Sequence, residues 1–286
     1  MIKPKYPPRH WSLVGYPGSG KSTFASNMKG PKLAIDADHR FNEVMDDDTY
    51  SLSDDPIDHI DTDRINTELM RNMPKSGIKT ILVDSLTAII TPIVVKVMLD
   101  KEKGRSKNLM AGMKEKALAM RQLQDAVSRW GTDVLWIYHL QDGRDGRSQE
   151  VTKQTISETE LLRLKRSINL QLKVVQNGTT RGIEILWARS GRSGITLWDE
   201  SGTWDNMPTR IEEAVYENLS DEEKIKIESD EPSFFPSKKI AVQWGFERGG
   251  FSSLEESSLA YDKIKLEEKP KTAQEMAHYW VELVRK

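Results

Sequence analysis

The most informative part of the sequence lies near the N-terminus and reads Gly15-Tyr16-Pro17-Gly18-Ser19-Gly20-Lys21-Ser22-Thr23. Its spacing is G-x-x-x-x-G-K-[ST], the pattern of a phosphate-binding loop. The apolar run 11–14 before it predicts a strand, and residues 22–28 after it predict the opening of a helix. Glycines in this setting let successive backbone N–H groups point at a phosphate chain, and the helix N-terminus adds partial positive charge. The stretch therefore predicts a nucleoside triphosphate site.

The side chains of this loop have separate expected roles. Lys21 is expected to reach the β- and γ-phosphates, and Ser22 is expected to hold Mg²⁺. ATP and Mg²⁺ are therefore the cofactors that the sequence predicts. A glycine-rich turn formed by chance is the alternative, and the strand and helix in register with the loop argue against it. The residues expected to surround the nucleotide are Gly15, Pro17, Gly18, Ser19, Gly20, Lys21, Ser22 and Thr23.

The composition limits the classes of function. The chain has 286 residues, enough for one large α/β domain and a small appendage. Its 42 basic and 44 acidic residues give a formal net charge of −2, so contact with nucleic acid would have to come from local basic clusters. The lack of cysteine excludes disulfides, thiolate zinc sites and cysteine nucleophiles. Because the sequence shows neither a signal-like segment nor a long apolar run, a cytoplasmic protein is expected.

Short apolar runs alternate with helical stretches, which is typical of a mostly parallel sheet covered by helices. The strands expected in this α/β core are 11–14, 32–36, 79–84 and 133–139, and the helices are 62–73, 86–99 and 109–130. Shorter strands at 168–176, 183–188 and 195–198 predict antiparallel hairpins at the sheet edge. The composition changes near Pro208, so the expected division is a core of residues 1–207 and an acidic linker with a small module at 208–286.

Asp84 supplies the second half of the expected nucleotide site. It ends the buried strand Ile81-Leu82-Val83-Asp84, where an aspartate is the usual partner of Mg²⁺ held by a loop serine. Asp84 also precedes a helix, so a role as helix N-cap is the alternative, and both roles can hold together. Many P-loop ATPases carry glutamate directly after this aspartate, as the base that orients water, but here Ser85 follows. The base must therefore come from elsewhere.

Three motifs together resemble RecA. The stretch Leu33-Ala34-Ile35-Asp36-Ala37-Asp38-His39 resembles the segment that carries the RecA catalytic glutamate, with Asp38 in that position. Val83-Asp84-Ser85-Leu86-Thr87-Ala88 resembles the metal-binding strand end of the same family. The long helix 112–130 and the strand 134–139 continue the match in order, over residues 10–200. The resemblance implies a RecA-like P-loop NTPase core, and the chain looks most like the phage class of annealing proteins and recombinases.

The resemblance implies catalytic roles beyond Lys21. Asp38 would be the base, although its side chain is one methylene shorter than glutamate and its carboxylate would lie about 1 Å further from the water. Hydrolysis is then expected to be slow, or Glu43 takes the role. His139 falls at the position that senses the γ-phosphate. The alternatives are a turn residue for Asp38 and a core histidine for His139.

Arg189 and Arg192 follow the strand 183–188, where RecA carries lysines that reach the γ-phosphate of the neighbouring subunit. The resemblance thus implies an arginine inserted in trans, which would stabilise the charge that develops in phosphoryl transfer. A basic hairpin turn with no such role is the alternative.

Two basic segments match the positions of the RecA loops that face DNA. These segments are 100–110 and 141–157, and neither carries an aromatic residue for base stacking, so recognition is expected to be electrostatic and tolerant of sequence. Solvated surface loops without a nucleic-acid role are the alternative. The residues expected to contact DNA are Lys101, Lys103, Arg105 and Lys107 in the first segment and Arg144, Arg147 and Lys153 in the second.

The favoured function is an ATP-dependent single-stranded DNA-binding protein that promotes homologous recombination or strand annealing, encoded by a phage and acting in the host cytoplasm. Its expected partners are single-stranded DNA, further copies of the chain in a filament or ring, and a single-strand-binding protein, with no membrane. The alternative is a stand-alone P-loop enzyme, such as a nucleotide kinase or a helicase-loading ATPase; Ser85 and the edge hairpins argue against it. A nucleotide-gated scaffold with negligible hydrolysis is a third possibility.

Overall fold

The computed structural model of the protein divides into two units, Met1–Leu219 and Ser220–Lys286. It describes residues 5–40, 46–102, 109–144, 150–220, 235, 237–248, 251 and 253–285. The buried hydrophobic clusters of the first unit share no residue with the cluster of the second. Each unit is therefore described by itself.

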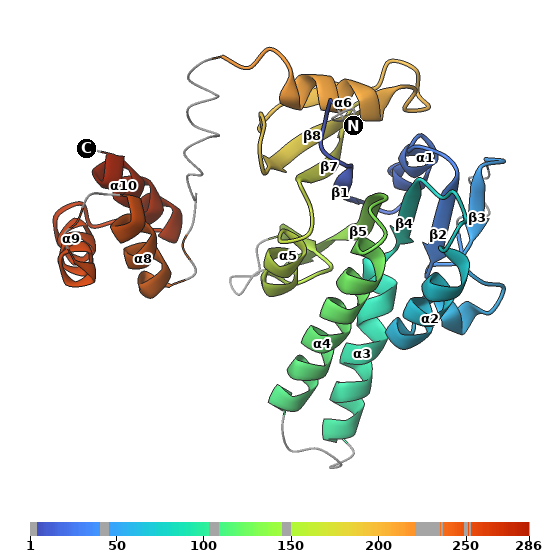
Figure 1. Cartoon of the computed structure of the whole chain (residues 1–286), viewed down its shortest axis with the longest axis horizontal. Helices are drawn as coiled ribbons and strands as arrows, with labels where there is room; N and C mark the ends of the chain where they lie inside the picture. Colours follow the sequence, from blue (N-terminus) through green and yellow to red (C-terminus); the bar gives the residue numbers. More distant parts are fainter. Residues whose placement is uncertain are drawn as a thin grey trace. The chain divides into compact units, whose positions relative to one another are not determined.

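Within the described residues, a nine-stranded sheet forms the centre of the first unit (Figure 1). The strands follow the order β3-β2-β4-β5-β1-β7-β8-β9, and β6 pairs with β5. Pairing is parallel from β3 to β7 in this order, and it is antiparallel for β8, β9 and β6. The predicted fold class, a mostly parallel α/β core with antiparallel edge strands, is confirmed. The strands are β1 (His10–Gly15), β2 (Lys32–Asp36), β3 (Thr49–Ser51), β4 (Thr80–Asp84), β5 (Asp133–Arg144), β6 (Glu150–Gln154), β7 (Leu170–Asn177), β8 (Thr180–Ala188) and β9 (Thr196–Trp198).

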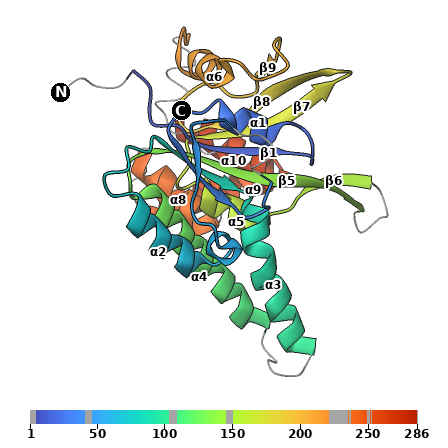
Figure 2. The same cartoon turned by 90° about the vertical axis from the view of Figure 1, so that its right-hand side faces the viewer.

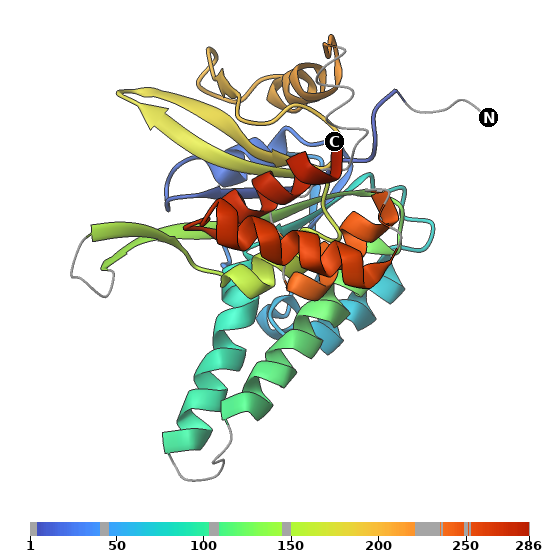
Figure 3. The same cartoon turned by 90° about the vertical axis from the view of Figure 1, so that its left-hand side faces the viewer.

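Helices connect and cover these strands. Two of them, α3 and α4, follow β4 and precede β5 in the chain. They lie side by side, and their far ends project from the sheet (Figures 1 and 2). The β5–β6 hairpin also extends from the body of this unit (Figure 3). The helices of the first unit are α1 (Lys21–Ser26), the 3₁₀ helix η2 (Pro56–His59), α2 (Thr62–Asn72), α3 (Leu86–Glu102), α4 (Leu109–Ser128), α5 (Glu158–Leu164) and α6 (Met207–Tyr216).

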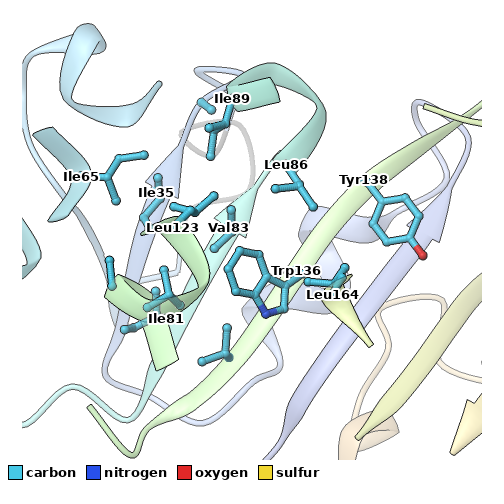
Figure 4. Close-up of a cluster of buried hydrophobic side chains, with 14 of the residues drawn as sticks. Ile35, Ile65, Ile81, Val83, Leu86, Ile89, Leu123, Trp136, Tyr138 and Leu164 are labelled. Atoms are coloured by element: carbon cyan, nitrogen blue, oxygen red, sulfur yellow. The ribbon is translucent and has the colours of Figure 1, made fainter. Parts of the chain in front are cut away.

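The sheet is buried on both faces. Every residue of β4 is buried, and its side chains alternate, with Ile81 and Val83 in one hydrophobic cluster and Leu82 in the other. Figure 4 shows the first cluster, where Ile65 of α2 and Leu123 of α4 point toward the strands. The second cluster is completed by residues of α1 and α6. Continuous apolar strands of this kind are expected where helices cover both faces of a parallel sheet.

Helix α6 belongs to the first unit, so the predicted boundary near Pro208 lies too early. Its residues Met207, Ile211 and Val215 are buried in the same cluster as β1 and β7. Glu212 forms a buried ion pair with Arg9, with bonds of 2.9 Å to Nε and 2.7 Å to Nη2. The structural boundary falls after Leu219 instead, because α6 is needed to cover the sheet.

The second unit contains the described helices α8 (Lys238–Arg248), α9 (Leu254–Glu267) and α10 (Ala273–Arg285). Trp280 is fully buried at its centre, stacks on Phe251 with ring centroids 5.8 Å apart, and donates its indole N–H to the Ala241 carbonyl at 2.8 Å. At the start of α10, the Thr272 hydroxyl accepts from the Glu275 N–H at 3.1 Å. Trp280 therefore organises a small helical core of its own.

Candidate nucleotide-binding site

The phosphate-binding loop lies at the carboxyl edge of the parallel sheet, between β1 and α1. β1 is an inner strand with β5 on one side and β7 on the other, and its last residue, Gly15, is in register with His139 of β5. Asp84 ends β4, which lies on the other side of β5 from β1, and it is in register with Asp36 of β2. Ligands of open α/β sheets bind outside this edge of the strands. The fold thus gathers these polar residues where a ligand is expected.

Backbone geometry and close contacts explain why glycine occupies three positions of the loop. Gly18 and Gly20 have φ angles of 73° and 90°, which L-residues with side chains rarely adopt. A Cβ at Gly15 would lie 2.7 Å from the Ser19 hydroxyl and 3.0 Å from Cβ of Val174. The loop can therefore fold back tightly only with glycine at these positions.

Lys21 is a buried cation whose hydrogen-bond partners in the described part of the chain are two carbonyls. It is 5% exposed, and its ammonium donates to the Gly15 carbonyl at 3.1 Å and to the Tyr16 carbonyl at 2.8 Å. Burial lowers the pKa of Lys21, while Asp84 and Asp38 act in the opposite direction. Among the described residues, none forms an ion pair with it. An anion at the loop would satisfy this charge, as the sequence predicts for a phosphate.

Ser22 and Asp84, the two residues predicted to hold Mg²⁺, lie next to each other. The Ser22 hydroxyl donates to Oδ2 of Asp84 at 2.9 Å. Burial raises the pKa of Asp84 to about 6, and the Ser22 bond opposes this rise, while Asp38 and Asp36 add to it. The described residues contain no group of three or more histidines and carboxylates arranged around one point. Mg²⁺ fits such a sparse set, because it prefers oxygen ligands and is commonly completed by water and substrate phosphates.

Asp38 and His139 meet in the same region. Nε2 of His139 lies 3.2 Å from Oδ2 of Asp38, and Nδ1 of His139 is buried with no partner among the described residues. Burial lowers the pKa of His139, and the nearby Lys21 charge lowers it further. A neutral His139 therefore donates through Nε2–H and holds the Asp38 carboxylate in place. Glu43, the alternative base, lies outside the described residues.

The structure does not bring Arg189 and Arg192 to this edge. β8 runs antiparallel to β7, so its end at Ala188 lies at the opposite edge of the sheet, in register with Leu170. The Arg189 guanidinium donates to the carbonyls of residues 165, 166 and 168. Arg192 donates to the carbonyls of residues 214 and 218. Both arginines thus hold the local fold of their own chain, and a role toward another subunit stays a prediction.

The segment 141–157 is not the loop that the sequence predicts. β5 continues to Arg144 and pairs with β6, so that Arg144 is in register with Glu150, and Gln141 with Lys153. The hairpin contacts the phosphate loop, because the Tyr16 hydroxyl donates to Oδ1 of Asp142 at 2.7 Å. The same hydroxyl lies 2.9 Å from the Thr152 hydroxyl.

The remaining predicted DNA residues are only partly described. Lys101 lies in the last turn of α3, and Lys103, Arg105, Lys107 and Arg147 lie outside the described residues.

Two residues near the loop escaped the sequence analysis. Arg181 of β8 and Trp204, which precedes α6, both lie against Gly20. Nothing in the local sequence marks either residue, because their proximity depends on the β7–β8 hairpin and on the packing of α6.

Comparison with known proteins identifies the family of this chain. Residues 8–189 match the family described as AAA domain, and the chain belongs to this family. The RadB recombinase structure is 14% identical with a TM-score of 0.39, over 68% of this chain and 87% of that chain. A KaiC-like protein from Pyrococcus horikoshii OT3 is 14% identical with a TM-score of 0.41, over 68% and 85%. A comparison with curated proteins found no significant match. No helix in the described part of the chain is long and apolar enough to cross a bilayer.

Proposed function

We propose that this protein is an ATP-dependent single-stranded DNA-binding protein that promotes homologous recombination or strand annealing and is encoded by a phage. The observation that carries the ATPase part is the meeting of Lys21, the Ser22–Asp84 pair and the Asp38–His139 pair at one sheet edge. The recombination part rests on the resemblance of the three sequence motifs to RecA. Membership in the AAA-domain family supports nucleotide binding.

The chemistry follows from these side chains. Lys21 would exchange the Gly15 and Tyr16 carbonyls for phosphate oxygens of ATP. Mg²⁺, when bound beside Ser22 and Asp84, would supply positive charge to the phosphate oxygens. Asp38 would accept the proton of the attacking water, and His139 would orient its carboxylate. A neutral His139 would keep its own Nε2 proton and offer it to the Asp38 carboxylate only as a hydrogen bond.

The DNA part rests on two elements, the β5–β6 hairpin and the basic stretch from Lys101 to Lys107. Arg144 and Lys153 lie on the β5–β6 hairpin, which the Tyr16 hydroxyl joins to the phosphate loop. Lys101 lies in the last turn of α3, and the sequence after it adds the basic residues Lys103, Arg105 and Lys107. Both elements follow strands whose carboxyl ends line the nucleotide site, so nucleotide and DNA can influence one another.

The test is single-stranded DNA binding across a salt series, followed by fluorescence anisotropy with and without ATP. Binding should be stronger with ATP and fall steeply with salt, because each neutralised phosphate releases about 0.7 counterion from a single strand. Replacing Lys101, Lys103, Arg105 and Lys107 together by alanine should flatten the salt slope by up to about three units. The control Lys21→Ala should remove the ATP effect and keep the salt slope.

A wild-type protein that binds ATP but fails to bind single-stranded DNA at low salt would overturn the DNA part and favour a kinase or a helicase-loading ATPase. A fourfold variant with an unchanged slope would place the DNA path on the β5–β6 hairpin instead.

A further inference from the structure

Gly20, the last glycine of the phosphate loop, is covered by two side chains from distant parts of the chain. A Cβ at this position would lie 2.4 Å from Nη1 of Arg181 and 3.0 Å from Nε1 of Trp204. Two nitrogen donors therefore approach the loop, one from the β7–β8 hairpin and one from the segment before α6. Neither residue belongs to the phosphate-loop motif.

The fold fixes Arg181 in this place. β7 runs parallel to β1 toward the nucleotide edge, and the hairpin turn returns the chain so that Arg181 is in register with Gln176. The Asp199 N–H donates to the Arg181 carbonyl at 2.8 Å and continues the pairing toward β9. Arg181 thus lies in the antiparallel part of the sheet formed by β7, β8 and β9, where strand pairing fixes its backbone.

Trp204 is held equally firmly. Its side chain is fully buried and packs edge-on against Phe24, with ring centroids 6.0 Å apart. Its backbone N–H donates to Oδ2 of Asp199 at 3.2 Å. Its indole N–H has no hydrogen-bond partner within the described part of the chain. Buried polar groups of this kind are normally satisfied, so the free donor points to an acceptor that the described residues do not provide.

The guanidinium of Arg181 is also unpaired with respect to the described residues, none of which forms an ion pair or a side-chain hydrogen bond with it. Arg9, by contrast, is paired with the Glu212 carboxylate, and Arg189 with three carbonyls. A guanidinium offers five N–H donors in a fork that matches phosphate oxygens. A phosphate at the adjacent loop would therefore be a suitable partner for the Arg181 guanidinium.

We propose that Arg181 binds the phosphate chain of the nucleotide held by its own subunit, as a second cation beside Lys21, with Trp204 donating a further hydrogen bond. This assignment rests on the proposed nucleotide binding. It differs from a role for Arg189 or Arg192, because it acts within one chain and needs no neighbouring subunit. A phosphate held between Lys21 and Arg181 would explain why both cations lack carboxylate partners among the described residues.

The test is isothermal titration calorimetry of the full chain with ATP, ADP and adenosine. Arg181→Ala should weaken ATP and ADP binding by about 10- to 100-fold, the usual effect of losing a hydrogen bond between charged groups. Arg181→Lys should recover part of the loss, because it restores the charge without the fork. Trp204→Phe keeps the ring and should cause a smaller loss. Arg121→Ala, which removes an exposed arginine of α4, is the matched control and should bind as wild type.

The outcomes separate the two proposals. If wild type binds ATP and Arg181→Ala binds it equally well, the role of Arg181 is wrong while nucleotide binding stands. If Arg181→Ala weakens adenosine as much as ATP, the contact is with the nucleoside and the phosphate assignment is wrong. If wild type itself binds no nucleotide, the proposed function fails and takes this assignment with it.

A mixing experiment tests the restriction to one chain. Arg181→Ala protein has an intact phosphate loop, and Lys21→Ala protein has an intact Arg181. Their mixture should bind ATP no more tightly than Arg181→Ala protein alone. Recovery of wild-type affinity in the mixture would show that Arg181 acts on a neighbouring subunit and would overturn the assignment.

Discussion

At the residue scale, Asp84 links the stability of the fold to the chemistry of the site. Burial raises the pKa of this carboxyl from 3.8 to about 6, so the folded protein binds the proton more tightly than the unfolded chain does. The contribution of Asp84 to the free energy of unfolding is therefore fully present below pH 4. It is lost as the pH rises through about 6. A site that needs this carboxylate ionised for Mg²⁺ is thus formed at a cost in stability.

Asp84→Asn removes this titration and keeps an oxygen that can accept from Ser22. From pH 4 to pH 7 the variant should gain up to about 3 kcal/mol of unfolding free energy relative to wild type, since one pKa unit corresponds to about 1.4 kcal/mol. Urea denaturation at several pH values measures the difference. Ser22→Ala is the companion variant, because it removes the bond that lowers the pKa of Asp84 and should shift the loss of stability to higher pH. A pH-independent difference for Asp84→Asn would contradict the account.

Asp38 is the residue on which hydrolysis depends in the proposed mechanism. Asp38→Asn should keep ATP binding and lower the hydrolysis rate by about 100- to 10,000-fold, the usual contribution of a positioned base. Single-turnover hydrolysis and calorimetry measure the two properties separately. Asp38→Glu keeps a carboxylate and is the matched control. Normal hydrolysis by Asp38→Asn together with loss of activity in Glu43→Gln would assign the base to Glu43.

At the element scale, the strands that carry the site were predictable and the hairpin beyond them was not. β2 and β4 end at Asp36 and Asp84 as the sequence predicts, because apolar runs buried on both faces give a clear signal. The continuation of β5 after Leu140 consists of Gln, Asp, Gly and Arg, and among the described strands it pairs with β6 alone. Such a strand needs no apolar face, so its sequence resembles that of a loop.

The hairpin gives Tyr16 a testable role. Its hydroxyl joins the phosphate loop to Asp142 and Thr152, and Tyr16→Phe removes both bonds while keeping the ring. We expect ATP affinity to change by less than about tenfold, because an exposed hydrogen bond contributes about 1 kcal/mol. The ratio of DNA affinities with and without ATP should fall. Tyr50→Phe, on another exposed tyrosine, is the control. An unchanged ratio in Tyr16→Phe would show that the hairpin does not transmit the nucleotide state.

At the scale of the whole molecule, the sequence could not predict which distant residues the chain topology brings together. The function of residues 15–23 can be predicted because the entire loop is contiguous in the sequence. Arg181 and Trp204 reach Gly20 only through the hairpin and the cover of α6. The same cover explains the misplaced boundary, since the buried Arg9–Glu212 pair ties α6 to the start of β1. Long-range packing therefore completes a site whose centre was predictable.

The two units lead to a prediction for the whole chain. The first contains every described residue of the nucleotide site, and the hydrophobic cluster around Trp280 shares no residue with its clusters. A protein ending at Leu219 should therefore fold and bind ATP with an affinity close to that of the full chain. In the full chain, Trp280→Ala should destabilise the second unit by about 3–5 kcal/mol and leave ATP binding unchanged. Calorimetric unfolding and ATP titration of the three proteins measure this, with Lys21→Ala as the non-binding control. Loss of ATP binding in the shortened protein or in Trp280→Ala would show instead that the second unit is required for the nucleotide site.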